Sequence, residues 1–340
     1  MGAMAHTLSP DGVPSPVVIV AGPTASGKSA LAIDLAREFG GTIINGDSMQ
    51  VYRELHVLTA RPSAAEEVRA PHRLYGFLPA AEPCSAGRWL QLACAEIAAV
   101  WAAGGLPIVV GGTGLYLKVL RRGLSPIPPI PEDVRQEVRA LHAELGGAAF
   151  RERLAALDPG AAAKLETGDG QRLMRAYEVA LATGRALSEW HADPPPPPPL
   201  PARFARIEVL PERDLLYAAI NARFEQMLGE GAWEEVEALL ALGLDPDLPA
   251  MKAVGVPELA AAIRGEQGRD WAVEKGKQAT RNYAKRQLTW LRNQEKGLRN
   301  QENGPADGEK RDLVIPAQYS ESHRAEIFSF IRPFLLNSGS

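Results

Sequence analysis

The run VVIVAGPTASGKS, from Val17 to Ser29, decides the fold class. It begins with apolar residues and then turns at Gly22 and Pro23, which is typical of a buried parallel strand that ends in a loop. The rest fits the pattern GxxxxGK[ST], and apolar residues at helical spacing follow directly. A strand, this loop and a helix in that order predict a phosphate-binding loop, or P-loop.

The chemistry of such a loop depends on a few groups. Glycines let the backbone curl so that successive N–H groups face one anion, and the helix N-terminus adds partial positive charge. Lys28 supplies a full charge, and the Ser29 hydroxyl can ligate Mg²⁺. The pattern leaves open which phosphate compound is bound. The residues predicted to hold the phosphate are Gly22, Pro23, Thr24, Ala25, Ser26, Gly27, Lys28 and Ser29.

Strands and helices alternate outward from this loop. Residues 42–45 and 107–110 are predicted strands, and residues 28–39 and 86–103 are predicted helices, which indicates an α/β fold with a parallel sheet. Asp47 and Thr113 each follow a strand, so both are expected near the loop, because the carboxyl ends of parallel strands face one crevice. A role as helix cap stays open for Asp47, Ser48 and Thr113.

The second half of the chain changes character. Residues 131–190 carry only helical patterns and turns, a run of six prolines follows Asp193, and a strand returns at 204–210. We therefore predict a helical insertion domain at 124–201 within a core formed by 17–123 and 202–340. The C-terminal part is predicted to be helical to about residue 293. A mobile loop at 295–311, a strand at 312–316 and a closing helix at 324–336 are expected to follow.

Composition limits the class of protein. The 340 residues suit two domains, and the net charge of −4 excludes a uniformly basic nucleic-acid binder but not a local basic patch. No stretch of about 18 apolar residues exists, so we expect no membrane span. Residues 1–16 lack the pattern of a signal peptide and are predicted to be a disordered leader. Cys84 and Cys94 suit reduced thiols of a cytoplasmic protein.

Taken together, the motifs resemble one family, the tRNA dimethylallyltransferases, also called tRNA isopentenyltransferases. The resemblance covers residues 17–292, and its blocks stand in one order. They are GPTASGKS at 22–29, DSMQVY at 47–52, TARP at 59–62, PHRL at 71–74, VGGTGLY at 110–116, QRLMRA at 171–176 and KRQLTWLR at 285–292. The chain departs from the family pattern with Leu58 for glycine, Arg61 for the frequent lysine and Val256 for a common tyrosine.

The resemblance implies an activity. The core would be P-loop NTPase-like but would bind dimethylallyl pyrophosphate instead of ATP, with Mg²⁺. The enzyme, expected to be a monomer, would prenylate the adenosine 3′ to the anticodon in tRNAs that read codons beginning with U. Lys28 and Arg223 would hold the pyrophosphate, Thr113 would contact its bridging oxygen, and Asp47 would accept the proton of the attacking amine.

The resemblance also implies the residues that contact the tRNA anticodon stem-loop. Basic residues on the helix near the C-terminus are a second source of evidence, because Lys277, Arg281, Lys285 and Arg292 fall on one predicted stripe. An ordinary solvated face is the alternative for that stripe. The implied contacts are Asp47, Ser48, Met49, Gln50, Thr113, Arg135, Gln171, Arg172, Leu173, Met174, Arg175, Met251, Lys252, Gly255, Arg281, Lys285, Arg286 and Arg292.

Three other functions fit part of the sequence. A small-molecule P-loop kinase would use the same loop for ATP, but no separate acidic Walker-B run or arginine cluster of a lid stands out. An adenylate isopentenyltransferase would take a free nucleotide, and the basic helix argues against it. A non-catalytic RNA-binding protein would not need Lys28, Ser29, Asp47 and Thr113 together.

Overall fold

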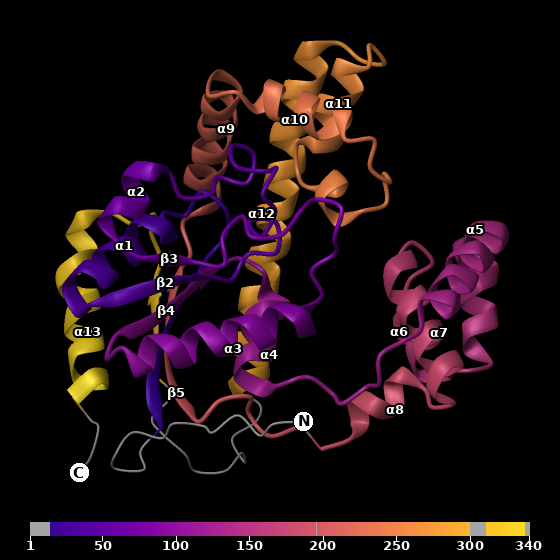
Figure 1. Cartoon of the computed structure of the whole chain (residues 1–340), viewed down its shortest axis with the longest axis horizontal. Coiled ribbons are helices and arrows are strands. Elements are labelled where there is room, and N and C mark those ends of the chain that lie inside the picture. The colour runs from indigo at the N-terminus through magenta and orange to yellow at the C-terminus, as the bar shows by residue number, and fades with distance from the viewer. Residues whose placement is uncertain (1–13, 195, 300–310, 337–340) are drawn as a thin grey trace. The chain divides into compact units, whose positions relative to one another are not determined.

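A computed structural model describes residues 14–194, 196–299 and 311–336. Its centre is one parallel six-stranded sheet with the strand order β3-β2-β4-β1-β5-β6 (Figure 1). The predicted α/β class with a parallel sheet is confirmed. The strands are β1 (Ser15–Ala21), β2 (Gly41–Asn45), β3 (His72–Arg73), β4 (Leu106–Gly111), β5 (Ala202–Val209) and β6 (Arg311–Ile315).

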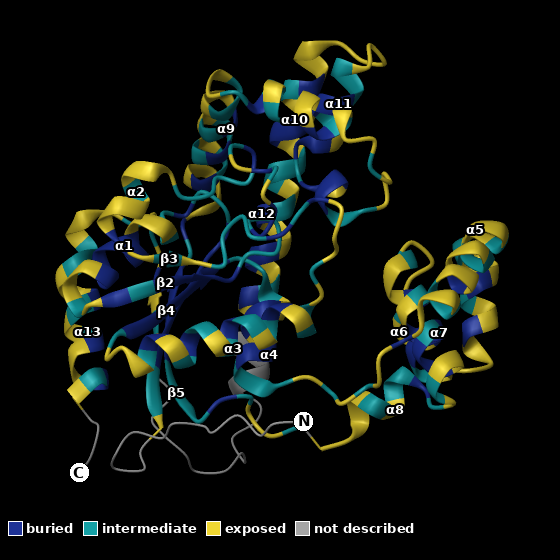
Figure 2. Ribbon diagram, in the orientation of Figure 1, coloured by how far each residue is buried: buried dark blue, intermediate teal, exposed yellow. Residues whose placement is uncertain are grey.

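Helices cover both faces of the sheet, so its central strands are buried on each side (Figure 2). The helices α1 (Lys28–Phe39) and α13 (Arg324–Leu336) pack on one face through Leu31, Leu35 and Ile331. On the other face lie α3 (Ala86–Ala102) and α4 (Gly114–Arg122), with Trp89 and Leu120 fully buried. This burial explains why β1 and β4 are almost continuously apolar in sequence.

Several sequence predictions agree with the elements, and a few do not. The helices predicted at 28–39 and 324–336 have those bounds in the structure. Strand β1 begins at Ser15, whose N–H donates to the carbonyl of Pro201, so the predicted leader of residues 1–16 is too long. The predicted loop 295–311 is helical as far as Arg299, and residues 300–310 lie outside the described part. Strand β3 and helix α2 (Ala64–Arg69) were not predicted.

Residues Arg122–Pro198 form a compact unit of their own, and the remaining residues form the other. The sequence placed this division at 124 and 201. The helices of the smaller unit are α5 (Glu132–Ala155), α6 (Pro159–Lys164), α7 (Gly170–Thr183) and α8 (Leu187–Ala192). Val138, Phe150, Leu154 and Leu173 are fully buried at its centre, so it has a hydrophobic core of its own.

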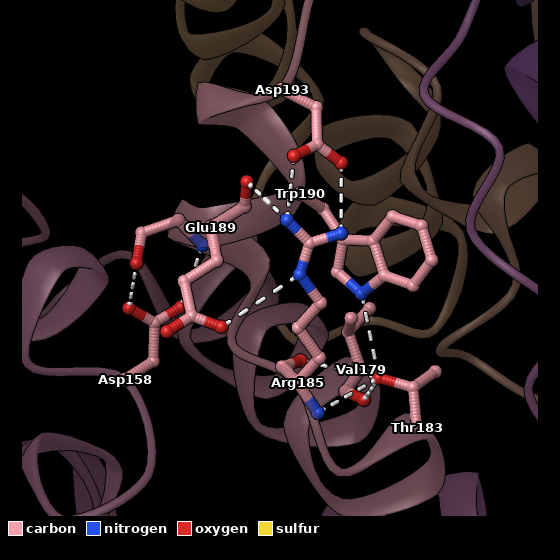
Figure 3. A network of polar contacts seen from close by, with 8 residues as sticks. Asp158, Val179, Thr183, Arg185, Glu189, Trp190 and Asp193 are labelled. Atoms are coloured by element: carbon pink, nitrogen blue, oxygen red, sulfur yellow. Dashed lines mark hydrogen bonds and ion pairs between the residues drawn. The ribbon is translucent and has the colours of Figure 1, made fainter.

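A polar network ties the end of this unit together (Figure 3). The Arg185 guanidinium donates to both carboxylate oxygens of Asp193, at 2.6 and 2.8 Å, and lies over the Trp190 ring. Nearby, Asp158 accepts hydrogen bonds from the main chain and hydroxyl of Ser188. Because Asp193 is the C-cap of α8 and directly precedes the six prolines, this bidentate pair holds the end of the last helix of the unit.

The larger unit continues after β5 into a group of helices that includes α12, the longest. A hydrophobic cluster around Phe224, Val236 and Leu259 holds most of them together. The helices are α9 (Arg213–Gly229), α10 (Ala232–Ala241), α11 (Val256–Ile263) and α12 (Arg269–Arg299), with a 3-10 turn at Pro249–Lys252.

The C-terminal segment fastens itself to the P-loop and to helix α1. The Tyr319 N–H donates to the Ser26 carbonyl at 3.1 Å, and the Tyr319 hydroxyl donates to Asp34 at 2.6 Å. Arg324 donates two further hydrogen bonds to the same carboxylate, at 2.8 and 2.9 Å. Asp34 is buried, so this carboxylate is a fixed point between α1 and the chain end.

We predict that Asp34→Asn destabilises the larger unit. The amide cannot satisfy all donors of Tyr319 and Arg324, and leaving a buried hydrogen-bonding group unsatisfied costs about 1–3 kcal/mol. Urea unfolding measures the effect, with Glu67→Gln on exposed α2 as a control for the change in charge. Equal stability of Asp34→Asn and the control would contradict the assignment.

Candidate active site

The P-loop leaves β1 at Gly22 and enters α1 after Gly27. Gly27 has φ +90°, a left-handed conformation that favours glycine, and it precedes the first helical residue. At Gly22 a Cβ atom would lie 2.7 Å from Ser26 Oγ and 2.8 Å from the Val209 carbonyl oxygen, so only glycine fits. The two glycines therefore allow the tight curl that the sequence pattern predicts.

A pocket opens beside this loop within the larger unit, and its lining has two kinds of wall. Lys28, Ser29, Asp47 and Arg223 provide charged and polar groups. Thr24, Gln50, Thr59, Thr280 and Tyr283 add further polar groups, and the other lining residues are apolar. The apolar members include Met49, Leu58, Ile220, Phe224, Met227, Ala253 and Val254. Such a pocket suits a ligand with one anionic end and one hydrocarbon end.

Two cations stand at the polar wall. Burial lowers the pKa of Lys28 to about 8; the Asp47 carboxylate opposes this shift, and Arg223 adds to it by repulsion. The Lys28 ammonium also donates to the Pro23 carbonyl at 3.2 Å. Burial likewise lowers the pKa of Arg223. Two cations held together without full hydration form a site for an anion, which would favour the charged form of Lys28.

Asp47 lines the pocket and also shapes its own loop. Its Oδ1 atom accepts the Met49 N–H at 2.9 Å, while its own N–H donates to Asn45 at 2.7 Å. The pocket role is thus present, whereas the helix-cap alternative is wrong for Asp47, because the next helix begins at Ala64 and is capped by Ser63. Thr113 is placed differently: its hydroxyl accepts the Ser48 N–H at 2.9 Å, and among the described residues it is not part of the pocket lining.

The structure adds two side chains that the sequence analysis did not select. Gln287, on α12, is buried; its amide oxygen accepts the Thr24 N–H at 2.9 Å, and its amide nitrogen donates to the Gly112 carbonyl at 3.1 Å. Tyr283, one turn earlier, lines the pocket, and its hydroxyl interacts with Thr113 and Gln287. Their spacing of four residues, which places both on one face of a helix, could have indicated them. The sequence prediction rested instead on the basic residues of α12.

The basic residues of α12 do not form one exposed stripe. Lys277 is buried and pairs with Glu225 at 2.7 Å and Glu274 at 2.9 Å, so its place in the predicted stripe is wrong. Arg281 is half-buried and donates to Asn221 at 2.6 Å. Three predicted residues, Lys285, Arg286 and Arg292, are exposed.

The other predicted contact residues differ widely in exposure. Met251 is buried, Gly255 packs against Leu58, and Lys252 is exposed and pairs with Asp247. In the smaller unit, Leu173 is fully buried. Its neighbours Gln171, Arg172 and Arg175 are exposed, while Met174 and Arg135 are half-buried.

Comparison with known proteins decides the family. A family model described as IPP transferase matches residues 50–294, and one described as isopentenyl transferase matches residues 15–78. The tRNA dimethylallyltransferase of Rhodospirillum centenum is 58% identical over 82% of this chain and 89% of that protein. The one from Paramagnetospirillum magneticum is 51% identical over 95% of this chain and 98% of that protein. The chain belongs to the tRNA dimethylallyltransferase family.

Solved structures agree with this membership. The tRNA isopentenylpyrophosphate transferase of Bacillus halodurans is 31% identical with a TM-score of 0.66, over 95% of this chain and 98% of that one. A eukaryotic dimethylallyltransferase solved while acting on tRNA has a TM-score of 0.78 at 24% identity, over 96% of this chain and 80% of that one, which shows the shared fold. In this member of the tRNA dimethylallyltransferase family, no described helix is both long and apolar enough to cross a membrane.

We predict that Gln287→Leu weakens binding of inorganic pyrophosphate. The change leaves the Thr24 N–H and the Gly112 carbonyl without their partner, at about 1–3 kcal/mol for each group, and loosens the loop. Titration calorimetry measures the affinity, with Gln278→Leu as an exposed control on the same helix. Unchanged affinity for pyrophosphate would show that Gln287 contributes only to folding.

Proposed function

We propose that this protein transfers a dimethylallyl group from dimethylallyl pyrophosphate to the exocyclic amine of an adenosine in tRNA. Family membership supports this activity. The observation that carries it is the pocket that joins the cations Lys28 and Arg223 to an apolar wall. That combination matches a pyrophosphate linked to a short hydrocarbon, whereas a nucleoside triphosphate would bring a polar sugar to the apolar wall.

The reaction breaks one bond and forms another. The allylic C–O bond of the donor breaks as the adenine amine nitrogen attacks that carbon, and pyrophosphate leaves with the bond's electron pair. Lys28, Arg223 and the amides of the P-loop stabilise the negative charge that develops on the leaving group. The amine loses a proton as the new C–N bond forms, and we assign Asp47 as the base that accepts it. Thr113 is assigned to the bridging oxygen through the family match alone.

Mg²⁺ fits the same place. Ser29, which lines the pocket, offers a hydroxyl oxygen as a ligand, and the phosphates of the donor would complete the set together with water. When bound, the ion would neutralise charge on the pyrophosphate.

The RNA substrate is proposed to be the anticodon stem-loop. The reactive adenine would leave its stack to enter the pocket, and unstacked loop bases are the usual target of proteins that read RNA. Lys285, Arg286 and Arg292 supply exposed positive charge on α12, and Arg172 and Arg175 supply it on the smaller unit. We propose that the target is the adenosine 3′ to the anticodon in tRNAs that read codons beginning with U.

Incubation of the protein with unmodified tRNA, Mg²⁺ and dimethylallyl pyrophosphate tests this function. Mass spectrometry of the nucleosides should detect an adenosine heavier by one dimethylallyl group, and sequencing of the RNA fragments gives its position. Transfer to free AMP but not to tRNA would instead favour an adenylate isopentenyltransferase.

We predict that Lys28→Ala and Arg223→Ala each raise the KM for the donor. Each substitution removes charged hydrogen bonds to the pyrophosphate, which are worth roughly 1.5–3 kcal/mol. Steady-state kinetics at varied donor concentration measures this, and Arg213→Ala, exposed on the same helix as Arg223, is the control. A donor KM unchanged in both variants would refute the assignment of Lys28 and Arg223 to pyrophosphate binding.

We predict a change in salt dependence for the double variant Lys285→Ala, Arg292→Ala. Each phosphate contact contributes about 0.7–0.9 to the slope of log affinity against log salt, so the loss of both should flatten the slope by about 1.4–1.8. Filter binding across a salt series gives the slopes, with exposed Lys275→Ala as the control. A slope like that of the unsubstituted protein would place the tRNA phosphates elsewhere.

A further inference from the structure

One wall of the pocket depends on a single carboxylate. Glu235, in the first turn of α10, accepts three backbone N–H groups from the loop that carries Leu58. His56 and Val57 donate to its Oε2 atom at 2.6 and 2.7 Å, and Leu58 donates to Oε1 at 2.9 Å. A carboxylate that accepts three amides holds the backbone far more firmly than one neutral hydrogen bond.

The carboxylate is itself well fixed. It lies at the N-terminus of α10, where the helix dipole favours negative charge. Ala232, Val236 and Leu239 of the same helix are fully buried in the core. On the other side of the loop, the Gln50 amide donates to the carbonyls of Thr59 and Ala60, both at 2.9 Å. The loop is therefore held at both ends of its pocket-lining part.

Leu58 is the largest apolar side chain that this loop presents to the pocket. It packs against Gly255, where an added Cβ atom would lie 3.1 Å from Leu58 Cδ2 and 3.4 Å from the Phe224 ring. Gly255 has φ +96°, so its backbone favours glycine and brings α11 close behind Leu58. With Gly255 packed against it and its backbone held by Glu235, Leu58 has little room to withdraw.

We propose that Leu58 limits the length of the donor's hydrocarbon chain, and that Glu235 is the positioning residue that keeps Leu58 in place. This inference rests on the proposed function, because it assumes a prenyl pyrophosphate in the pocket. A five-carbon chain would meet the Leu58 side chain as part of the apolar lining. A ten-carbon chain would need the space that Leu58 fills.

Competing kinetics with two donors tests this. The protein and its variants receive tRNA with dimethylallyl or geranyl pyrophosphate, and the ratio of the two kcat/KM values is measured. For Leu58→Ala the ratio should shift toward geranyl by more than about 10-fold, because one methylene in an apolar pocket is already worth about 10- to 200-fold and this change removes three side-chain carbons. Leu58→Val should shift it less. Glu235→Gln should shift it in the same direction and raise the donor KM, while the KM for tRNA stays unchanged.

Glu234→Gln is the matched control, because it removes the same charge from the same helical turn at an exposed position. It should leave the donor ratio as in the unsubstituted protein. If Leu58→Ala does not fold, Leu58→Val decides the role of Leu58.

A ratio unchanged in the Leu58 variants would overturn the limit on chain length. If Glu235→Gln lowers the melting temperature but leaves the ratio and the donor KM unchanged, Glu235 only stabilises the fold. Absence of transfer by the unsubstituted protein from either donor would instead overturn the proposed function, and this inference with it.

Discussion

The site depends on two hydrogen bonds that hold the backbone of the P-loop in place. Gln287 holds the Thr24 N–H from α12, and Tyr319 holds the Ser26 carbonyl from the C-terminal segment. Neither contact comes from the strand or helix that flanks the loop in sequence. The loop amides therefore keep their direction before an anion arrives, and such preorganisation is what makes them effective toward a developing charge.

Charge and apolar surface are then arranged around that fixed loop. Lys28 and Arg223 lose hydration where they stand, which lowers the pKa of each, and an anion between them would compensate that cost. The apolar lining comes from α9, which also carries Arg223, from Ala253 and Val254 just before α11, and from the loop that Glu235 holds. A buried ion pair between Arg206 and Glu208 lies next to the P-loop strand but takes no part in the pocket lining among the described residues.

Local sequence patterns predicted the sheet and the phosphate loop, because the residues that form each strand and the loop are consecutive in the sequence. The GxxxxGK[ST] pattern located the loop, and periodicity located α1 and α13 at their observed bounds. Hydrogen bonds between distant residues have no local sequence pattern. Gln287 is 263 residues from its partner Thr24, and Glu235 is 177 residues from its partner Leu58. Lys277 failed as a member of the predicted basic stripe because helical spacing cannot reveal that Glu225 of another helix pairs with it.

The proposed function requires that the P-loop and the apolar lining of the pocket bind a short prenyl pyrophosphate and not a nucleoside triphosphate. Titration calorimetry of the full chain with dimethylallyl pyrophosphate and with ATP, at the same Mg²⁺ concentration, tests it most directly. We expect saturable binding of dimethylallyl pyrophosphate that inorganic pyrophosphate weakens, and much weaker binding of ATP. Tighter binding of ATP than of dimethylallyl pyrophosphate would contradict it.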